Sequence, residues 1–151
     1  MLRTRLNDAL KDAMKAKEAL ATSTLRLILA ALKDRDIAER TKGNGDGLGD
    51  EAILEMLQKM VRQRHDSIEM YNKGQRPELA KREAEEIEVI ERFLPKQMDE
   101  TDMRAAIDGV IGELGASSVK DMGRVMATLK QRYPGRMDFG KASGIVKEAL
   151  V

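Results

Sequence analysis

The chain has 151 residues, a net charge of +1, no cysteine, no tryptophan and a single histidine, His65. It is long enough to bury a hydrophobic core, and the lack of cysteine excludes disulfide scaffolds, thiolate zinc sites and cysteine nucleophiles. Aromatic residues make up 3% of the chain, and its abundant Leu, Ala, Met, Glu, Lys and Arg favour helices over strands. We therefore expect an all-α fold without a metal site. A histidine-based triad would have to use His65.

No segment has the pattern of a membrane span or of a targeting signal. The apolar runs are all shorter than the ~18 residues that a transmembrane helix needs. The start of the chain carries Asp8, Asp12 and Glu18 in an amphipathic pattern, unlike a signal or transit peptide. These features predict a cytoplasmic protein with no membrane partner.

Residues 1–95 predict an N-terminal bundle of about four helices. Apolar residues at every fourth position, from Leu2 to Met14, predict the first helix over residues 2–17. A dense aliphatic run predicts the second over residues 22–40, with Ile37 closing its buried stripe.

The third and fourth helices follow a glycine-rich loop at residues 43–49. Asp50 is a suitable N-cap for a helix over residues 50–72. Pro77 suits the first turn of the fourth helix, and Pro95 stops it. Apolar residues from Ala80 to Leu94, with Ala84 and Ile87 among them, are expected to form its buried face.

Three features could carry chemistry but have structural interpretations that fit better. The glycine-rich loop lacks the spacing of a phosphate-binding loop, and a calcium-binding register would place Leu48 where an oxygen ligand is needed, so we interpret it as a flexible turn. His65 has no nucleophile or metal ligand beside it, and we expect it on a helix flank. Glutamates spread around the fourth helix are expected to be solvated or paired with basic neighbours. They are Glu83, Glu85, Glu86, Glu88 and Glu91.

Residues 96–151 predict a separate C-terminal unit of about three short helices. The first is expected over residues 100–114 and is closed by Gly115, where a helix commonly ends. Ser117 and Ser118 form a capping pair before the second helix, and the third begins near Asp138.

Charge is distributed unevenly along the chain. Residues 1–95 are balanced, residues 96–113 have a net charge of −3, and residues 114–151 have a net charge of +4. A basic surface of this kind can contact phosphates, and it can equally be an ordinary solvated face. The candidate nucleic-acid-binding residues are Lys120, Arg124, Lys130, Arg132, Arg136, Lys141 and Lys147.

Several segments, in order and spacing, resemble the GatB/YqeY family over nearly the whole chain. The matching segments are Leu25–Lys33 with Asp36-Ile37, Arg64-x-x-Ser67-x-x-x-Tyr71, Gly74-x-Arg76 with Leu79-Ala80-x-x-Glu83-x-x-Glu86, Phe93-Leu94-Pro95-x-Gln97-Met98, Lys120–Met126, Gly135-Arg136, and Val146-Lys147-x-x-Leu150. Two positions depart from the pattern. Phe93 stands where Tyr is common and Pro77 stands where an acidic residue is common, and neither change threatens the fold.

This resemblance implies two all-helical subdomains, residues 1–95 and 96–151. It also links the chain to the C-terminal tail of the B subunit of the glutamine-dependent aspartyl/glutamyl-tRNA amidotransferase. That tail is associated with tRNA, whereas the phosphorylating active site lies in a separate domain that has no counterpart here.

Our leading hypothesis is therefore an accessory module that binds tRNA or another structured RNA, with no catalytic residues and no cofactor. The alternative is a protein-interaction module that docks on an amidotransferase or a translation factor. A third hypothesis, a carbon–nitrogen ligase activity, lacks a nucleophile, a phosphate-binding loop and a metal set in this sequence.

Overall fold

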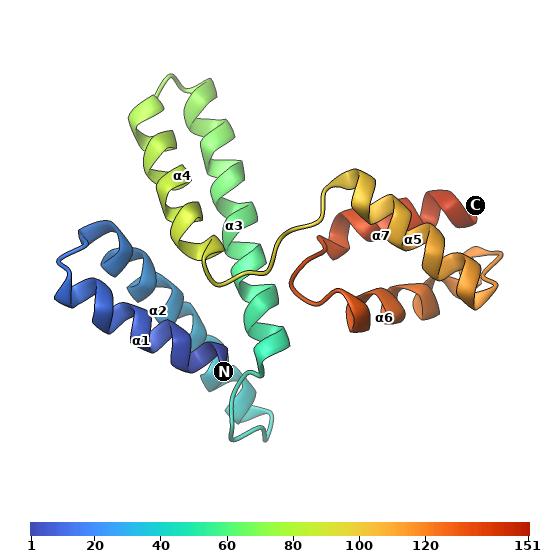
Figure 1. The fold of residues 1–151 in the computed structure, drawn as a ribbon, viewed down its shortest axis with the longest axis horizontal. Coiled ribbons are helices and arrows are strands. Elements are labelled where there is room, and N and C mark those ends of the chain that lie inside the picture. Colours follow the sequence, from blue (N-terminus) through green and yellow to red (C-terminus); the bar gives the residue numbers. More distant parts are fainter. The chain divides into compact units, whose positions relative to one another are not determined.

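The computed structural model describes residues 1–151 and contains helices but no strand, which confirms the all-α prediction (Figure 1). The chain forms two compact units, which we call the N-terminal unit (Met1–Leu94) and the C-terminal unit (Pro95–Val151). None of the helices combines the length and apolar composition that crossing a membrane requires. The helices are α1 (Leu2–Lys15), α2 (Ala19–Thr41), α3 (Asp50–Lys73), α4 (Pro77–Glu91), α5 (Glu100–Leu114), the 3-10 turn η1 (Val119–Asp121), α6 (Met122–Arg132) and α7 (Phe139–Leu150).

The N-terminal unit consists of two helical hairpins, α1 with α2 and α3 with α4 (Figure 1). Its core is aliphatic, and Leu6, Ile28, Ile53, Leu57 and Ile90 are fully buried. Burial of each such side chain stabilises the fold by about 1.5–3 kcal/mol. The core therefore joins all four helices of this unit, as one hydrophobic cluster.

Two helix ends in this unit follow local sequence signals, and a third does not. Pro77 occupies the first turn of α4, and Gly74 ends α3. The prediction that Asp50 caps α3 is wrong, because Gly49 is the N-cap and Asp50 is already helical. The Asp50 carboxylate instead lies 3.4 Å from the backbone nitrogen of Leu2, at the start of α1.

In the N-terminal unit, the predicted apolar stripes are wrong at three positions. Ile37 and Met14 are 49% and 50% exposed, and Ala84 is exposed as well. Two carboxylates take buried places nearby, since Asp36 and Glu86 are each only 8% exposed. Burial of a charged group is unfavourable without a partner, so each of these carboxylates must be paired.

Asp36 is held by Arg3 and by the loop that follows α2. Arg3 donates from both terminal nitrogens to the carboxylate, at 2.5 and 3.0 Å, and also donates to the carbonyl of Leu48 at 2.9 Å. The backbone N–H of Leu48 donates to Asp36 Oδ1 at 3.0 Å. These bonds tie α1, α2 and the glycine-rich loop together, so this loop is anchored rather than a free turn.

Glu86 is paired in the same way between α3 and α4. Arg64 Nε donates to its Oε2 at 2.9 Å, and Arg82 approaches Oε1 at 3.7 Å. Arg64 also donates to the carbonyl of Met60. Arg64, which interrupts the apolar positions of α3, thus supplies the charge that allows one of the predicted surface glutamates to be buried.

Gly47 is required by this anchoring. It has a φ of +78°, and a Cβ added to it would collide with the Asp36 carboxylate. Gly45, two residues earlier, has open space around its Cα and does not adopt a positive φ. The two glycines therefore provide a test and a matched control within one loop.

We expect Gly47→Ala to destabilise the N-terminal unit by about 2–4 kcal/mol, because it adds left-handed backbone strain to a steric overlap. Gly45→Ala should change the stability by less than about 1 kcal/mol. Native-state hydrogen exchange of the α1 and α2 amides measures both effects. Equal protection in the two variants would contradict the proposed role of Gly47.

The Arg3–Asp36 pair also predicts a pH dependence. Hydrogen bonding from Arg3, aided by Leu48, holds the pKa of Asp36 below its ordinary value of 3.8. A lowered folded-state pKa stabilises the fold above the unfolded pKa, and this stabilisation is lost as the pH falls through the folded pKa.

At pH 7 we expect Arg3→Ala to cost about 1–2 kcal/mol, a modest value because the Arg3 side chain is 34% exposed. The difference in unfolding free energy between wild type and Arg3→Ala should shrink as the pH falls from about 5 to about 2. Urea unfolding followed by circular dichroism measures it, with the exposed Lys11→Ala on α1 as control. A difference that is independent of pH would be inconsistent with the pair.

The C-terminal unit has its own hydrophobic cluster, formed by α5, α6 and α7. Asp99 caps α5 by accepting from the backbone N–H of Asp102 at 2.7 Å, and Asp138 caps α7 through the N–H groups of Gly140 and Lys141. Gly115 ends α5 in the left-handed conformation, with φ +61°. The predicted second helix begins as η1, and Ser118 precedes it as N-cap.

Candidate nucleic-acid interface

All seven candidate cations are exposed side chains of the C-terminal unit. They follow α5 in the chain and occupy the part of the unit with the positive net charge. Their positions are Lys120 in η1; Arg124, Lys130 and Arg132 on α6; Arg136 in the connection to α7; and Lys141 and Lys147 on α7.

The helices bring some of these cations together and separate others. Lys120 and Arg124 are one turn apart and lie on one side of the η1–α6 segment. Lys130 lies six residues beyond Arg124, and this spacing rotates it by about 120° around the helix. The same spacing separates Lys141 from Lys147 on α7. The seven side chains therefore lie on several faces and do not form one row.

The three arginines are engaged within the unit. Arg124 pairs with Asp121 at 3.0 Å, and Arg132 pairs with Glu113 at 2.5 Å. Arg136 Nε donates to the carbonyl of Lys96 at 3.3 Å, and its guanidinium lies 6.0 Å from the centroid of the Tyr133 ring. These contacts orient the guanidinium groups and neutralise part of the positive charge.

The pKa of each of the two paired carboxylates lies below its ordinary value. Hydrogen bonding from Arg132 lowers the pKa of Glu113. The pKa of Asp121 is lowered chiefly by the backbone N–H of Ser117, and then by Arg124. Asp121 thus serves two purposes, since it accepts from the backbone at the start of η1 and also holds Arg124.

The four lysines differ from the arginines because none of them forms a salt bridge. Lys141 is the least favourable of them for an anion, because it lines a cavity of about 400 Å³ together with Asp99, Asp138 and Glu148. Lys120, Lys130 and Lys147 are exposed and form no salt bridge, although Lys120 and Lys147 adjoin Asp121 and Glu148 in the chain. These three lysines are therefore the better candidates for contact with an external phosphate.

Other candidate positions lie outside this surface. His65 is exposed on α3, as expected for a helix-flank residue. No group of three or more His, Asp or Glu side chains has the arrangement of a metal site. Sequence reasoning missed the partners Glu113 and Asp121. The three-residue spacing of Asp121 and Arg124 could have revealed one pair, whereas Glu113 and Arg132 are nineteen residues apart.

Comparison with known protein families shows to which family this chain belongs. The profile of the family described as "Yqey-like protein" matches residues 3–150. The chain belongs to this family. It is a small helical module of the YqeY-like type, and the resemblance inferred from its sequence motifs is confirmed.

The curated relatives within this family carry a mitochondrial name. "Altered inheritance of mitochondria protein 41, mitochondrial" from Lachancea thermotolerans is 33% identical over 75% of this chain and 59% of its own length. The proteins of the same name from Candida glabrata and Kluyveromyces lactis are 35% and 33% identical, over 59% and 58% of this chain and 47% and 45% of theirs. The chain therefore spans about half the length of the curated relatives it matches.

These names contradict the predicted cytoplasmic location. That prediction rested on the lack of an apolar span and of a targeting pattern near Asp8 and Asp12. The reasoning fails because a charged helical surface suits any aqueous compartment and cannot distinguish the cytoplasm from the interior of a mitochondrion.

Proposed function

We propose that this YqeY-like protein is an accessory RNA-binding module whose C-terminal unit contacts the phosphate backbone of a tRNA or another structured RNA. The observation that carries the proposal is the set of four exposed lysines without salt bridges, in a segment of net charge +4. Lysines that lack an internal salt-bridge partner are free to pair with an external anion. The resemblance of this unit to the tRNA-associated amidotransferase tail supports the same assignment.

Recognition would depend on RNA shape more than on base sequence. Tyr133 and Phe139 are the aromatic residues of the unit, and both are half-buried. Tyr133 also lies against the Arg136 guanidinium. A unit with so few available rings can stack few bases, so phosphate and sugar contacts would supply most of the affinity.

The arginines would have secondary roles. A guanidinium has five N–H donors, and Arg124 and Arg136 each retain donors that no internal acceptor uses. Their internal contacts would hold them in a fixed orientation beside the lysines. Arg132, whose charge is matched by Glu113, would contribute least.

The first test measures the binding of a fluorescently labelled tRNA to the full chain, by anisotropy at several KCl concentrations. A variant with Lys120, Lys130, Lys141 and Lys147 changed to Gln should bind more weakly. The slope of log K against log salt should decrease by about 0.7–0.9 for each lysine that contacts a phosphate.

The matched control changes four exposed lysines of the N-terminal unit, Lys11, Lys15, Lys17 and Lys59, to Gln. This control alters the net charge of the chain equally but should leave the slope nearly unchanged. The proposal fails if wild type does not bind tRNA at low salt, or if both variants lose affinity and slope to the same extent.

A second prediction concerns Glu113. Glu113→Gln removes the partner of Arg132 and frees that guanidinium for a phosphate. We expect a few-fold tighter binding of tRNA, and a slope of log K against log salt that is steeper by about 0.8. Asp108→Asn removes the same charge from α5 without freeing an arginine and serves as the control. Equal effects of the two changes would show only a general charge effect.

A further inference from the structure

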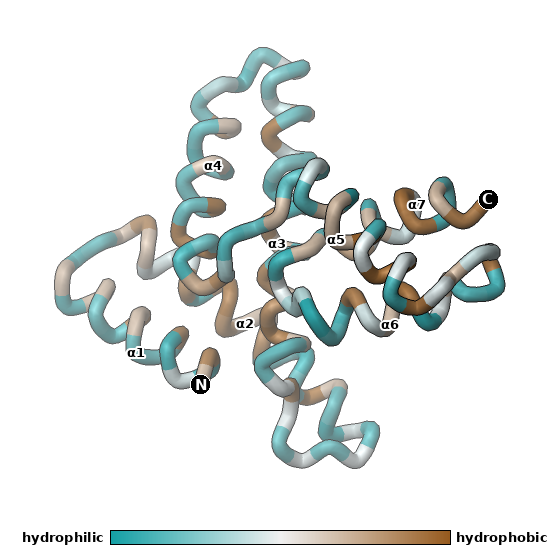
Figure 2. Tube along the Cα trace, turned by 45° about the vertical axis from the view of Figure 1, so that its right-hand side comes forward, coloured by the Kyte–Doolittle hydropathy of each residue, from teal (hydrophilic) through white to brown (hydrophobic).

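Helix α2 carries apolar residues on two faces, which is unusual for a helix at the edge of a small bundle. One face, with Leu25, Ile28 and Leu32, is buried in the core. In Figure 2 the tube is brown to pale brown near the α2 label, the colours of hydrophobic residues. The outward side is mixed, since it carries the exposed apolar residues Leu27, Ala30 and Ile37 among charged side chains. Apolar residues on the face opposite the core are those that a partner helix would cover.

The second face follows the alternating three- and four-residue spacing of a coiled-coil seam. We call this set the outer seam of α2, and its members are Leu20, Ser23, Leu27, Ala30, Asp34 and Ile37. Leu27 and Ile37 are 48% and 49% exposed, and Ala30 is exposed too. Such a spacing matches another helix laid alongside at a shallow angle.

A row of cations borders the outer seam on one side. Arg26, Lys33 and Arg40 are spaced seven residues apart and so recur about every 10 Å along the same edge of α2. All three are exposed, and none forms a salt bridge. In a coiled coil, the charges that border the seam determine which partner is accepted.

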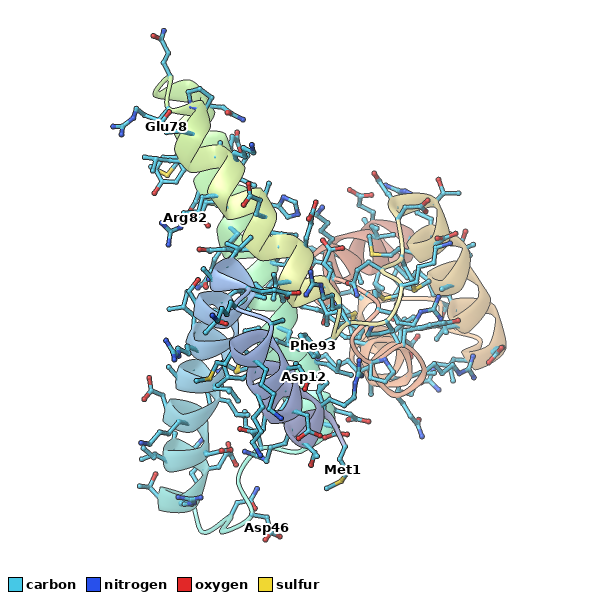
Figure 3. All side chains as sticks on the ribbon, turned by 60° about the vertical axis from the view of Figure 1, so that its left-hand side comes forward. Met1, Asp12, Asp46, Glu78, Arg82 and Phe93 are labelled. Carbon is cyan, nitrogen blue, oxygen red and sulfur yellow. The ribbon has the colours of Figure 1, made fainter.

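The seam leads into a groove at the start of α2. This groove has a volume of about 530 Å³ and lies between α2 and α4, with Leu20 and Ser23 on one wall and Lys81, Arg82 and Glu85 on the other. Figure 3 labels Glu78 and Arg82, which lie on the same side of α4 and both line this groove. Leu20 and Ser23 belong to both features, so the seam and the groove form one continuous surface.

We propose that the outer seam of α2 docks an acidic amphipathic helix from a partner protein. The heptad spacing calls for a helix, and the three cations call for carboxylates that recur every seven residues on it. A nucleic acid suits the surface less well, since the exposed apolar residues Leu27 and Ile37 lie among the cations and Asp34 places a negative charge within the seam.

A second copy of this chain would not satisfy the seam. Two α2 helices packed antiparallel would place the rows of Arg26, Lys33 and Arg40 against each other and repel. Packed in parallel, each row would face Ala31 and Ala38, which are uncharged, since Thr24 at the equivalent position is buried. The charge pattern therefore favours a different protein with acidic flanks.

The test uses designed 21-residue peptides of three heptads and the full chain. In each heptad, the acidic peptide carries Leu at the two seam positions and Glu at the two positions that flank them. The basic peptide carries Lys in place of each Glu. The flanking like charges keep each peptide monomeric. We expect the chain to bind the acidic peptide at least about tenfold more tightly than the basic one, because three exposed charge pairs act together.

A charge reversal, R26E/K33E/R40E, should invert this preference. The matched control K11E/K15E/K59E makes the same charge change at exposed lysines of the same unit and should preserve it. The variant L27S/I37S should weaken the binding of both peptides without changing the helix content of the chain, which circular dichroism measures. Titration calorimetry of each variant gives the affinities.

Several results would overturn the proposal. These are equal affinity for the two peptides, equal behaviour of the reversal and its control, self-association that L27S/I37S abolishes, and loss of tRNA binding in R26E/K33E/R40E. Peptide binding that survives the four Lys→Gln changes in the C-terminal unit would separate this proposal from RNA binding. Either proposal can therefore fail alone.

Discussion

The N-terminal unit depends on a carboxylate buried in the last third of α2. Asp36 would be strongly unfavourable there without Arg3, because an unpaired charge in a poorly solvated place has lost its water. The Arg3 guanidinium comes from α1, and Leu48 from the loop completes the coordination of both side chains. One polar cluster thus fixes the position of α1 on α2 and the path of the chain into α3.

This cluster also explains why α2 presents its apolar residues as it does. With Asp36 directed inward, its neighbour Ile37 must lie about 100° away on the helix, and it becomes exposed. The exposed isoleucine then aligns with Leu27 on the outward side. A buried polar contact therefore helps to create an apolar surface elsewhere on the same helix.

Much of the fold could be predicted from local patterns, since they depend on neighbours along the chain. Leucine spacing placed the helices, and Pro77, Gly74 and Gly115 placed several of their ends. Asp36 could not be predicted to be buried. Its partner Arg3 is thirty-three residues away, and counting apolar residues on α2 selects Ile37 instead.

The basic residues of the C-terminal unit show the same limit of prediction from sequence. Composition identified the basic residues of the C-terminal unit, but a sequence cannot say which of them are neutralised. Arg132 and Lys130 are nearly adjacent in the chain and equally charged, yet one pairs with Glu113 on another helix and the other does not. Pairing across helices depends on how α5 and α6 pack, so only the structure distinguishes the two.

The connection between α2 and α3 constrains how the lengths of related chains can differ. Around Gly43 and Gly45 the surroundings are open, so extra residues inserted there would extend into solvent. From Gly47 onward, an insertion or deletion would shift Leu48 out of register with Asp36 and Arg3. Related chains should therefore vary in length in the first half of this connection and keep a constant length in the second.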